Sequence, residues 1–334
     1  MSRRANRAGL TAALAMCLSI AVIGCAGPDA AEKVILSPQI DGEWQQIAGN
    51  PDLGKYTSSR QEPVDFAVWQ AADGTWQLWS CIRNTKCGGR TRLFYRWEGK
   101  NLTDANWQPI GIAMQADTNV GEQTGGLQAP YVIRIKDVYY MFYGDWNRIC
   151  LATSVDGKHF ERTKNERGEP DLFSGPYENT RDPIVLKSRG LYFCYYTGHV
   201  TGNSPQKHKC AVFCRTSSDL KKWSEPVKVS AGGSPAQGKE WDGGNAECPF
   251  VVEMQGRYYL FRNQKYGKNN LNTQYCSLNP FDFGVDDDSF MTGTLAVAAP
   301  EIIEHNGQYY IAALMPNLKG IRIAKLKWLP KKQE

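Results

Sequence analysis

Short apolar stretches alternate with polar turns along most of the chain, and one pattern recurs five times. In each copy an apolar stretch is followed by a turn residue and then by a second stretch rich in aromatic residues. The copies are DFAVWQAADGTWQLW (65–79), APYVIRIKDVYYMFY (129–143), DPIVLKSRGLYFCYY (182–196), CPFVVEMQGRYYLF (248–261) and APEIIEHNGQYYIAA (299–313). Two apolar strands around a tight turn form a β-hairpin, so the pattern predicts five hairpins.

A second hairpin signal follows at least two copies, in residues 151–157 and 215–220. Each repeat unit therefore contains about four strands. Such a unit cannot bury its apolar face alone and must stack on its neighbours. The sequence predicts an all-β protein, a single five-bladed β-propeller over residues 46–330. The alternative is an irregular β-sandwich in which the turn patterns coincide by chance.

The N-terminus has a different pattern. Three Arg residues precede an apolar run over residues 10–23, which is typical of a secretory signal peptide. The run ends in Val-Ile-Gly-Cys25, which resembles the bacterial lipobox, whose Cys receives a diacylglyceryl group; an ordinary signal peptide with a chance Cys is the alternative. We expect a signal peptide over 1–25 with lipidation at Cys25. A tether over 26–45, able to add a strand to the last blade, would follow. The protein would be exported and anchored by its lipid to the cell envelope, at the outer membrane or in the periplasm.

The formal net charge gives little information about partners. It is +5 for the chain, and removing residues 1–25 takes away three Arg and no acid, which leaves +2. A charge so near balance gives no electrostatic argument for binding nucleic acid or a strongly acidic polymer. We expect a monomer that binds no nucleic acid.

Eight cysteines lie beyond Cys25. An exported protein with an even number of cysteines can form disulfides, and the candidate pairs are Cys81 with Cys87 and Cys194 with Cys214. With four His in the chain and no close ligand spacing, we expect no metal and no cofactor. His199 and His305 are the residues that could hold a central ion or water.

Acidic residues stand at the starts of the predicted inner strands. Asp65 opens the first copy, Asp182 the third, and Glu247 directly precedes the fourth; Glu301 lies one residue further inside the fifth. In a propeller these strand starts meet at one mouth of the central axis. Taken singly, Asp182 is also explained as a turn residue and Glu247 as a surface residue. Together they fit glycosidic bond cleavage, which needs one carboxyl group as an acid and another as base or nucleophile.

Two short motifs carry a family resemblance. Arg181-Asp182-Pro183 and Glu247-Cys248 resemble motifs of the invertase and levanase glycoside hydrolases, family 32. The plan with Asp, Asp and Glu on blades one, three and four is similar to the arabinanase and xylosidase group, family 43. The resemblance implies Asp65 as general base or nucleophile, Glu247 as general acid and Asp182 as the residue that orients substrate and modulates the acid. It implies that Arg181 holds sugar hydroxyls.

The second strand of each hairpin runs back toward the mouth, so the residues at its end should face substrate. Polar and aromatic side chains there suit a sugar. The candidate substrate-binding residues are Arg83, Asp145, Trp146, His199 and Arg262, with Trp241 in the loop before Glu247. Trp146 and Trp241 are candidates for sugar stacking, with edge packing of the propeller as the alternative.

Three functions remain open from the sequence. The first is hydrolysis of O-glycosidic bonds in an oligo- or polysaccharide. The second is a noncatalytic carbohydrate-binding propeller, against which the presence of all three acids argues. The third is a glycoside phosphorylase of the same fold, which would need a basic phosphate pocket; Arg83, Arg181 and Arg262 are the candidates for it.

Overall fold

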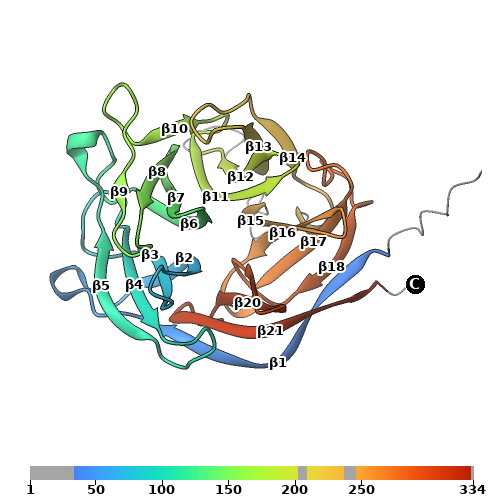
Figure 1. The fold of residues 1–334 in the computed structure, drawn as a ribbon, viewed down its shortest axis with the longest axis horizontal. Coiled ribbons are helices and arrows are strands. Elements are labelled where there is room, and N and C mark those ends of the chain that lie inside the picture. Colours follow the sequence, from blue (N-terminus) through green and yellow to red (C-terminus); the bar gives the residue numbers. More distant parts are fainter. Residues whose placement is uncertain (1–33, 202–208, 237–245, 332–334) are drawn as a thin grey trace, which may run out of the picture. The chain divides into compact units, whose positions relative to one another are not determined.

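The computed structural model describes residues 34–201, 209–236 and 246–331. These residues form five antiparallel sheets around a central axis (Figure 1). The only helices among them are four single 3-10 turns, η1 (Gly54–Tyr56), η2 (Thr118–Val120), η3 (Ser234–Ala236) and η4 (Gly267–Asn269). None of the described helices is long and apolar enough to cross a bilayer. The predictions of an all-β chain and of a single five-bladed β-propeller are confirmed.

In the first four blades the strands follow one another in chain order from the axis outwards. Blade one contains β2 (Glu62–Gln70), β3 (Trp76–Arg83), β4 (Leu93–Gly99) and β5 (Gln108–Met114). Blade two contains β6 (Leu127–Ile135), β7 (Val138–Asp145), β8 (Arg148–Ser154) and β10 (Asp171–Ser174), and the short β9 (Glu161–Arg162) also pairs with β8. Blade three contains β11 (Asn179–Ser188), β12 (Leu191–His199), β13 (Cys210–Ser217) and β14 (Val227–Ser230). Blade four contains β15 (Glu247–Met254), β16 (Arg257–Lys265), β17 (Leu271–Ser277) and β18 (Met291–Leu295).

Blade five joins the two ends of the described chain. Its inner strands are β19 (Glu301–His305), β20 (Gln308–Leu314) and β21 (Gly320–Pro330), and its outer strand is β1 (Leu36–Gly49). β1 is antiparallel to β21, from Leu36 opposite Pro330 to Gly49 opposite Gly320. Residues 36–45, the second half of the expected tether, therefore lie in the propeller. This is the added strand that the sequence left open.

The second hairpin signal corresponds to a repeated turn. Ser154 and Asp156 after β8 form it in blade two, where the Asp156 carboxylate accepts backbone hydrogen bonds from residues 158 and 159. Ser217 and Asp219 after β13 form the same turn in blade three. Side-chain bonds of this kind satisfy the turn backbone locally.

Aromatic side chains fill the spaces between neighbouring blades. Trp69 and Trp79 of blade one pack against Phe160 of blade two, with ring centroids 5.8 and 5.3 Å from that of Phe160. The Trp69 indole N–H also donates to the Gly157 carbonyl oxygen (2.8 Å). Large rings with one satisfied polar atom bury much apolar area, which explains why the aromatic second strands of the repeat stack well.

Neither candidate disulfide is formed, since all eight described cysteines are free thiols. Cys194 and Cys214 lie on adjacent strands, but Cys194 is opposite Arg215 and Cys214 is opposite Tyr195. A register offset of one residue places the two side chains on opposite faces of the sheet. Cys81 donates to the Leu127 carbonyl oxygen and Cys87 to that of Arg92, so these thiols do not face each other either.

Candidate active site

Each inner strand has a residue in the left-handed backbone region at or close to its start. The five positions are equivalent in the repeat, and they are Asp65 (φ 38°), Ala129 (41°), Asp182 (56°), Cys248 (43°) and Ala299 (46°). In blades one to four the strand pairing skips at the same point, which is a β-bulge. Left-handed non-glycine residues cost on the order of 1–3 kcal/mol each, and bulges commonly redirect a side chain next to a functional site.

These strand starts line one pocket on the axis. Every blade contributes, through Asp65, Ala129, Asp182, Cys248, Ala299 and the residues that follow each of them, together with Glu301. All five of the residues that follow are Phe or Pro, so the pocket has apolar walls around a few acidic groups. The sequence prediction that Asp65 and Asp182 meet at the mouth agrees with this geometry.

A thiol lies between the two aspartates. The Cys248 Sγ is 3.1 Å from an Asp65 carboxylate oxygen and 3.7 Å from an Asp182 oxygen. The Cys248 backbone N–H donates to the same Asp182 oxygen (3.1 Å), and the Tyr266 hydroxyl lies 2.9 Å from the thiol. Cys248 and Tyr266 were missed in the sequence, although Cys248 occupies the repeat position of the two aspartates.

Glu247 is held by an ion pair. Its carboxylate accepts from the Arg181 guanidinium, whose Nη1 also donates to Asn179, and the Arg181 Nε lies 3.5 Å from an Asp182 oxygen. The side chains of Arg181, Asp182 and Glu247 are at most 11% exposed. Arg181 thus links the two carboxylates of blades three and four, and Cys248 links Asp182 to Asp65.

Burial and like charges raise the pKa values of acids in the pocket. Burial, and then the neighbouring Asp182 carboxylate, raise the pKa of Asp65 to about 6. Burial also raises the pKa of Asp182, against the opposing effect of Arg181. Glu301 is buried, accepts from the Val68 backbone N–H (2.9 Å), and has a pKa raised well above its usual range by burial. Raised carboxyl pKa values at a pocket are typical of acid–base catalysis.

Within the described residues, one group has the spacing to hold a metal ion. It consists of Asp65, Asp182 and Cys248, whose ligand atoms lie within 4.8 Å of one another. Two carboxylates and a thiol suit a borderline or soft divalent cation better than Ca²⁺ or Mg²⁺, which prefer oxygen. The expectation that the protein uses no metal and no cofactor stays a prediction.

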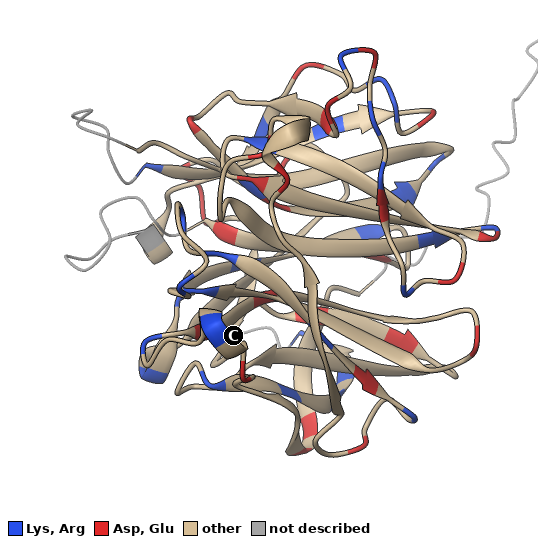
Figure 2. Cartoon of the chain, turned by 90° about the vertical axis from the view of Figure 1, so that its left-hand side faces the viewer, with Lys and Arg blue, Asp and Glu red and all other residues tan. Residues whose placement is uncertain are grey.

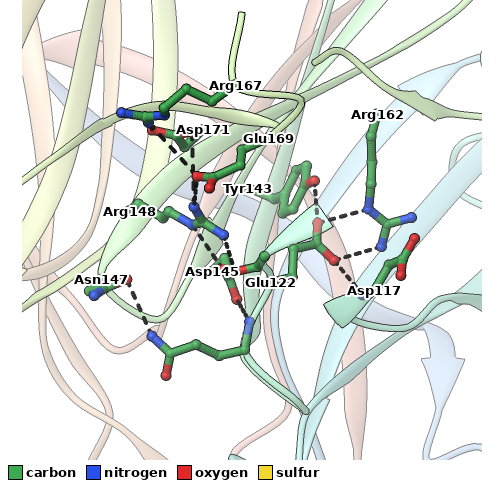
Figure 3. Close-up of polar contacts among 12 residues, drawn as sticks. Asp117, Glu122, Tyr143, Asp145, Asn147, Arg148, Arg162, Arg167, Glu169 and Asp171 are labelled. Atoms are coloured by element: carbon green, nitrogen blue, oxygen red, sulfur yellow. Dashed lines mark hydrogen bonds and ion pairs between the residues drawn. The ribbon is translucent and has the colours of Figure 1, made fainter. Parts of the chain in front are cut away.

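Asp145 belongs to a charged network on blade two rather than to the axial pocket (Figure 3). Its side chain is fully buried, accepts from the Gln123 backbone N–H (2.9 Å) and pairs with Arg148 (3.0 Å). Arg148 also pairs with Glu169 (2.8 Å), and residues 121, 123, 147, 171 and 174 line a cleft beside them. Asp145 therefore holds the end of β7 in place through ion pairing.

The same network contains a second buried carboxylate. Glu122 has a fully buried side chain, takes two bonds from Arg162 (2.8 and 2.7 Å) and accepts from the Tyr143 hydroxyl (2.7 Å) (Figure 3). A buried carboxylate without its partner is strongly destabilising. We expect Arg162→Ala to lower the free energy of unfolding in urea by about 3–5 kcal/mol.

The matched control for that variant is Arg167→Ala. Arg167 pairs with Asp171 (2.7 Å), but its side chain is 67% exposed. Exposed pairs contribute about 1 kcal/mol or less. If both variants lost the same stability, burial of Glu122 would not be the cause.

The other predicted substrate-binding residues have varied surroundings. Arg83 pairs with Glu62 (2.8 Å) at the mouth. Arg262 is 1% exposed and donates to Ser230 Oγ (2.9 Å) and the Gly232 carbonyl oxygen (2.8 Å), so it holds the end of β14. His199 ends β12 opposite Asn179 in the sheet. Trp146 follows β7 and lies beneath the guanidinium groups of Arg90 (4.1 Å) and Arg92 (4.9 Å). Trp241 and Cys25 lie outside the described residues.

Comparisons with known proteins point to one family. The family model for glycosyl hydrolases family 43 matches residues 123–319, more than half of the chain. None of the curated proteins matches the chain.

Solved structures resemble the fold at low sequence identity. A thermostable family-43 glycoside hydrolase is 17% identical at a TM-score of 0.58, over 83% of this chain and 96% of that one. A β-xylosidase/α-arabinofuranosidase from a compost microbial metagenome is 15% identical at 0.56, over 84% and 96%. An endo-arabinase from Bacteroides thetaiotaomicron is 14% identical at 0.58, over 85% and 99%.

Proposed function

The chain belongs to glycosyl hydrolases family 43 and is a glycosidase, and from this premise we propose that Asp65, Asp182 and Glu247 are its catalytic carboxylates. The observation that carries this proposal is the chain of contacts from Asp65 through Cys248 to Asp182, and through Arg181 to Glu247. It connects three acids from three blades, two of which, Asp65 and Asp182, line the axial pocket. Because such acids repel one another, their collection needs a chemical reason.

In the proposed mechanism, Glu247 protonates the leaving glycosidic oxygen. Asp65 acts from the other side, as a base toward water or as a nucleophile toward the anomeric carbon. With its pKa at about 6, Asp65 is mostly ionised at neutral pH and accepts a proton readily. Asp182 raises the pKa of Asp65, and Arg181 positions Glu247 between blades three and four.

The substrate is an oligo- or polysaccharide, and its sugar is the open part of the proposal. Similar structures include a β-xylosidase/α-arabinofuranosidase and an endo-arabinase, which makes pentose-containing glycans the first to test. All five blades of one chain line the pocket in the described residues, and we propose that the protein acts as a monomer.

A phosphorylase is less well supported than a hydrolase. Its three candidate phosphate ligands already have partners in the described residues: Glu62 for Arg83, Glu247 for Arg181, and Ser230 with Gly232 for Arg262. A binding propeller without turnover has no observation in its favour.

We also propose that the protein is exported and lipid-anchored to the cell envelope through Cys25. The supporting observation is the sequence, in which three Arg residues precede an apolar run that ends in Val-Ile-Gly-Cys25. Cell fractionation tests this, since Cys25→Ser would move the protein from the membrane to the soluble fraction.

The experiment that tests the function is a hydrolysis screen. The protein without residues 1–25 is incubated with aryl glycosides and with arabino-, xylo- and fructo-oligosaccharides, with and without inorganic phosphate. Release of free sugar that does not depend on phosphate supports the hydrolase. Phosphate-dependent release of sugar phosphate would support a phosphorylase, and binding without cleavage a binding propeller.

A further inference from the structure

Two arginine side chains lie over one indole ring at the mouth. The guanidinium carbon of Arg90 is 4.1 Å and that of Arg92 is 4.9 Å from the centroid of the Trp146 ring. Because both lie within 5 Å of one ring, the two cations are closer than the Debye length of about 10 Å at 0.1 M salt and repel each other. Cation–π contact offsets part of this cost, and an anion between them would remove it.

Neither arginine has an anionic partner among the described residues. Every ion pair there involves other cations, and the nearby carboxylates of Glu122 and Asp145 are paired with Arg162 and Arg148. Arg92 donates to the Arg90 carbonyl oxygen (3.0 Å), and the Arg90 side chain is exposed. Their remaining N–H groups are available to a ligand from solvent.

The backbone fixes this arginine pair in place. The Arg90 N–H donates to the Thr124 carbonyl oxygen (2.9 Å), and the Arg92 N–H donates to that of Gly125 (3.0 Å). A Cβ at Gly89 would lie 2.0 Å from the Thr124 oxygen, so only glycine allows this approach of the blade-one loop to blade two. A ligand would therefore bind two guanidinium groups whose backbone positions are already fixed, which lowers the entropy cost of binding.

The pair borders the catalytic residues. The Trp146 carbonyl oxygen accepts from the Thr180 N–H (3.1 Å), and Thr180 directly precedes Arg181 and Asp182. The β7 end packs so closely here that a Cβ at Gly144 would lie 3.3 Å from the Arg181 backbone. The end of β7, which is followed by Trp146, therefore contacts the strand that carries Arg181 and Asp182.

Other cations lie toward the same end of the propeller. Arg60, Lys86 and Lys319 lie on loops of blades one and five, Lys265 ends β16 in blade four, and none of them forms an ion pair within the described residues. Figure 2 shows a group of Lys and Arg positions on loops at the lower left of the view. Although the net charge of the chain is small, Lys and Arg residues without an ion-pair partner gather on these loops. This part of the mouth is therefore expected to attract anions.

We propose that Arg90 and Arg92 form an anion-binding subsite for an acidic saccharide, in which they bind an oxyanion carried on a sugar ring, the carboxylate of a uronic acid or a sulfate ester. Guanidinium forks match both groups in shape and charge. This inference rests on the proposed glycosidase function, because it places the acidic sugar in a subsite next to the cleaved bond.

The test measures binding with the Glu247→Gln protein, so that ligands stay intact. Oligogalacturonate, sulfated galactan fragments, neutral xylo- and arabino-oligosaccharides and inorganic phosphate are titrated by calorimetry at 20 and 200 mM NaCl. We expect one acidic class to bind at least about tenfold more tightly than the neutral sugars at low salt, with the preference reduced at high salt. Which acidic class binds distinguishes a carboxylate from a sulfate.

The variant is Arg90→Gln with Arg92→Gln, and the control is Arg134→Gln. Arg134 also lies over an aromatic ring, that of Tyr139 (5.2 Å), but near the C-terminal end of β6, at the opposite end of the propeller. The double variant is expected to lose the acidic preference by about tenfold, while the control keeps it.

Three results would overturn the inference. They are equal binding of neutral and acidic sugars, an unchanged acidic preference in the double variant, and binding of phosphate alone as tightly as acidic sugars. The outcomes are separable from the proposed function. Cleavage by the unaltered enzyme together with any of these three results removes the subsite but keeps the glycosidase, whereas acidic preference without cleavage keeps the subsite and removes the catalytic assignment.

Discussion

Glu247→Gln is expected to lower kcat by about 10³-fold on substrates with poor leaving groups. Glutamine keeps the shape and can still accept from Arg181, but it has no proton to give to the leaving oxygen. The loss should shrink on dinitrophenyl glycosides, because their leaving groups need little protonation. Steady-state kinetics on a series of aryl glycosides measures both effects.

The control for that variant is Glu253→Gln on the same strand, β15. Its side chain is exposed and lies outside the axial pocket. It should retain activity within about twofold, as surface substitutions generally do. Activity of the Glu247 variant above a tenth of the unaltered enzyme would show that the acid lies elsewhere, and Glu301, buried with a raised pKa, would be the next residue to test.

Asp65→Asn is expected to lower kcat by a similar factor, about 10³-fold, on all aryl glycosides, including those with activated leaving groups. A base or nucleophile is needed whatever the leaving group, so this variant should not recover on dinitrophenyl substrates. Asp137→Asn is the control, since its side chain is 99% exposed in a hairpin turn. Recovery on activated substrates would assign Asp65 the role of the acid.

The pH profile tests the same assignment. Asp65 must be ionised to act, and its pKa is about 6, so kcat/KM of the unaltered enzyme should fall as the pH drops through about 6. Asp182 contributes to that raised pKa through its negative charge. In Asp182→Asn the residual activity should therefore persist to lower pH. If the acidic limb of the pH profile stayed at the same pH or moved to higher pH in this variant, the effect of Asp182 on the pKa of Asp65 would be contradicted.

The five-fold repeat made the fold predictable, but it did not predict which residues lie opposite each other on neighbouring strands. Hairpins and their turns depend on nearby residues, which is why five blades could be counted from the sequence. The pairing of β1 with β21 joins residues nearly 300 positions apart, and the sequence only left it open. The disulfide between Cys194 and Cys214 failed because one residue of register changes the face of a strand.

The position of the site could be predicted from the sequence, but the contacts of its side chains could not. Alignment of the repeats placed Asp65 and Asp182 at one mouth, and Cys248 occupies the same position of its repeat. Asp145 and Arg262 also lie at strand ends that the sequence analysis assigned to substrate binding. In the structure Asp145 pairs with Arg148, and Arg262 donates to Ser230. The hydrogen-bond and ion-pair partner of each polar side chain depends on distances between side chains in the folded structure. A single sequence does not contain these distances.

The joining of β1 to β21 has a consequence for how the chain folds during synthesis. β1 is the first strand of the propeller to leave the ribosome, yet its partner is the last strand of the propeller. Until that partner emerges, β1 has an unpaired edge that can associate with other chains. We infer that completion of the ring is a late and slow step, because loop closure over almost the whole chain must precede it.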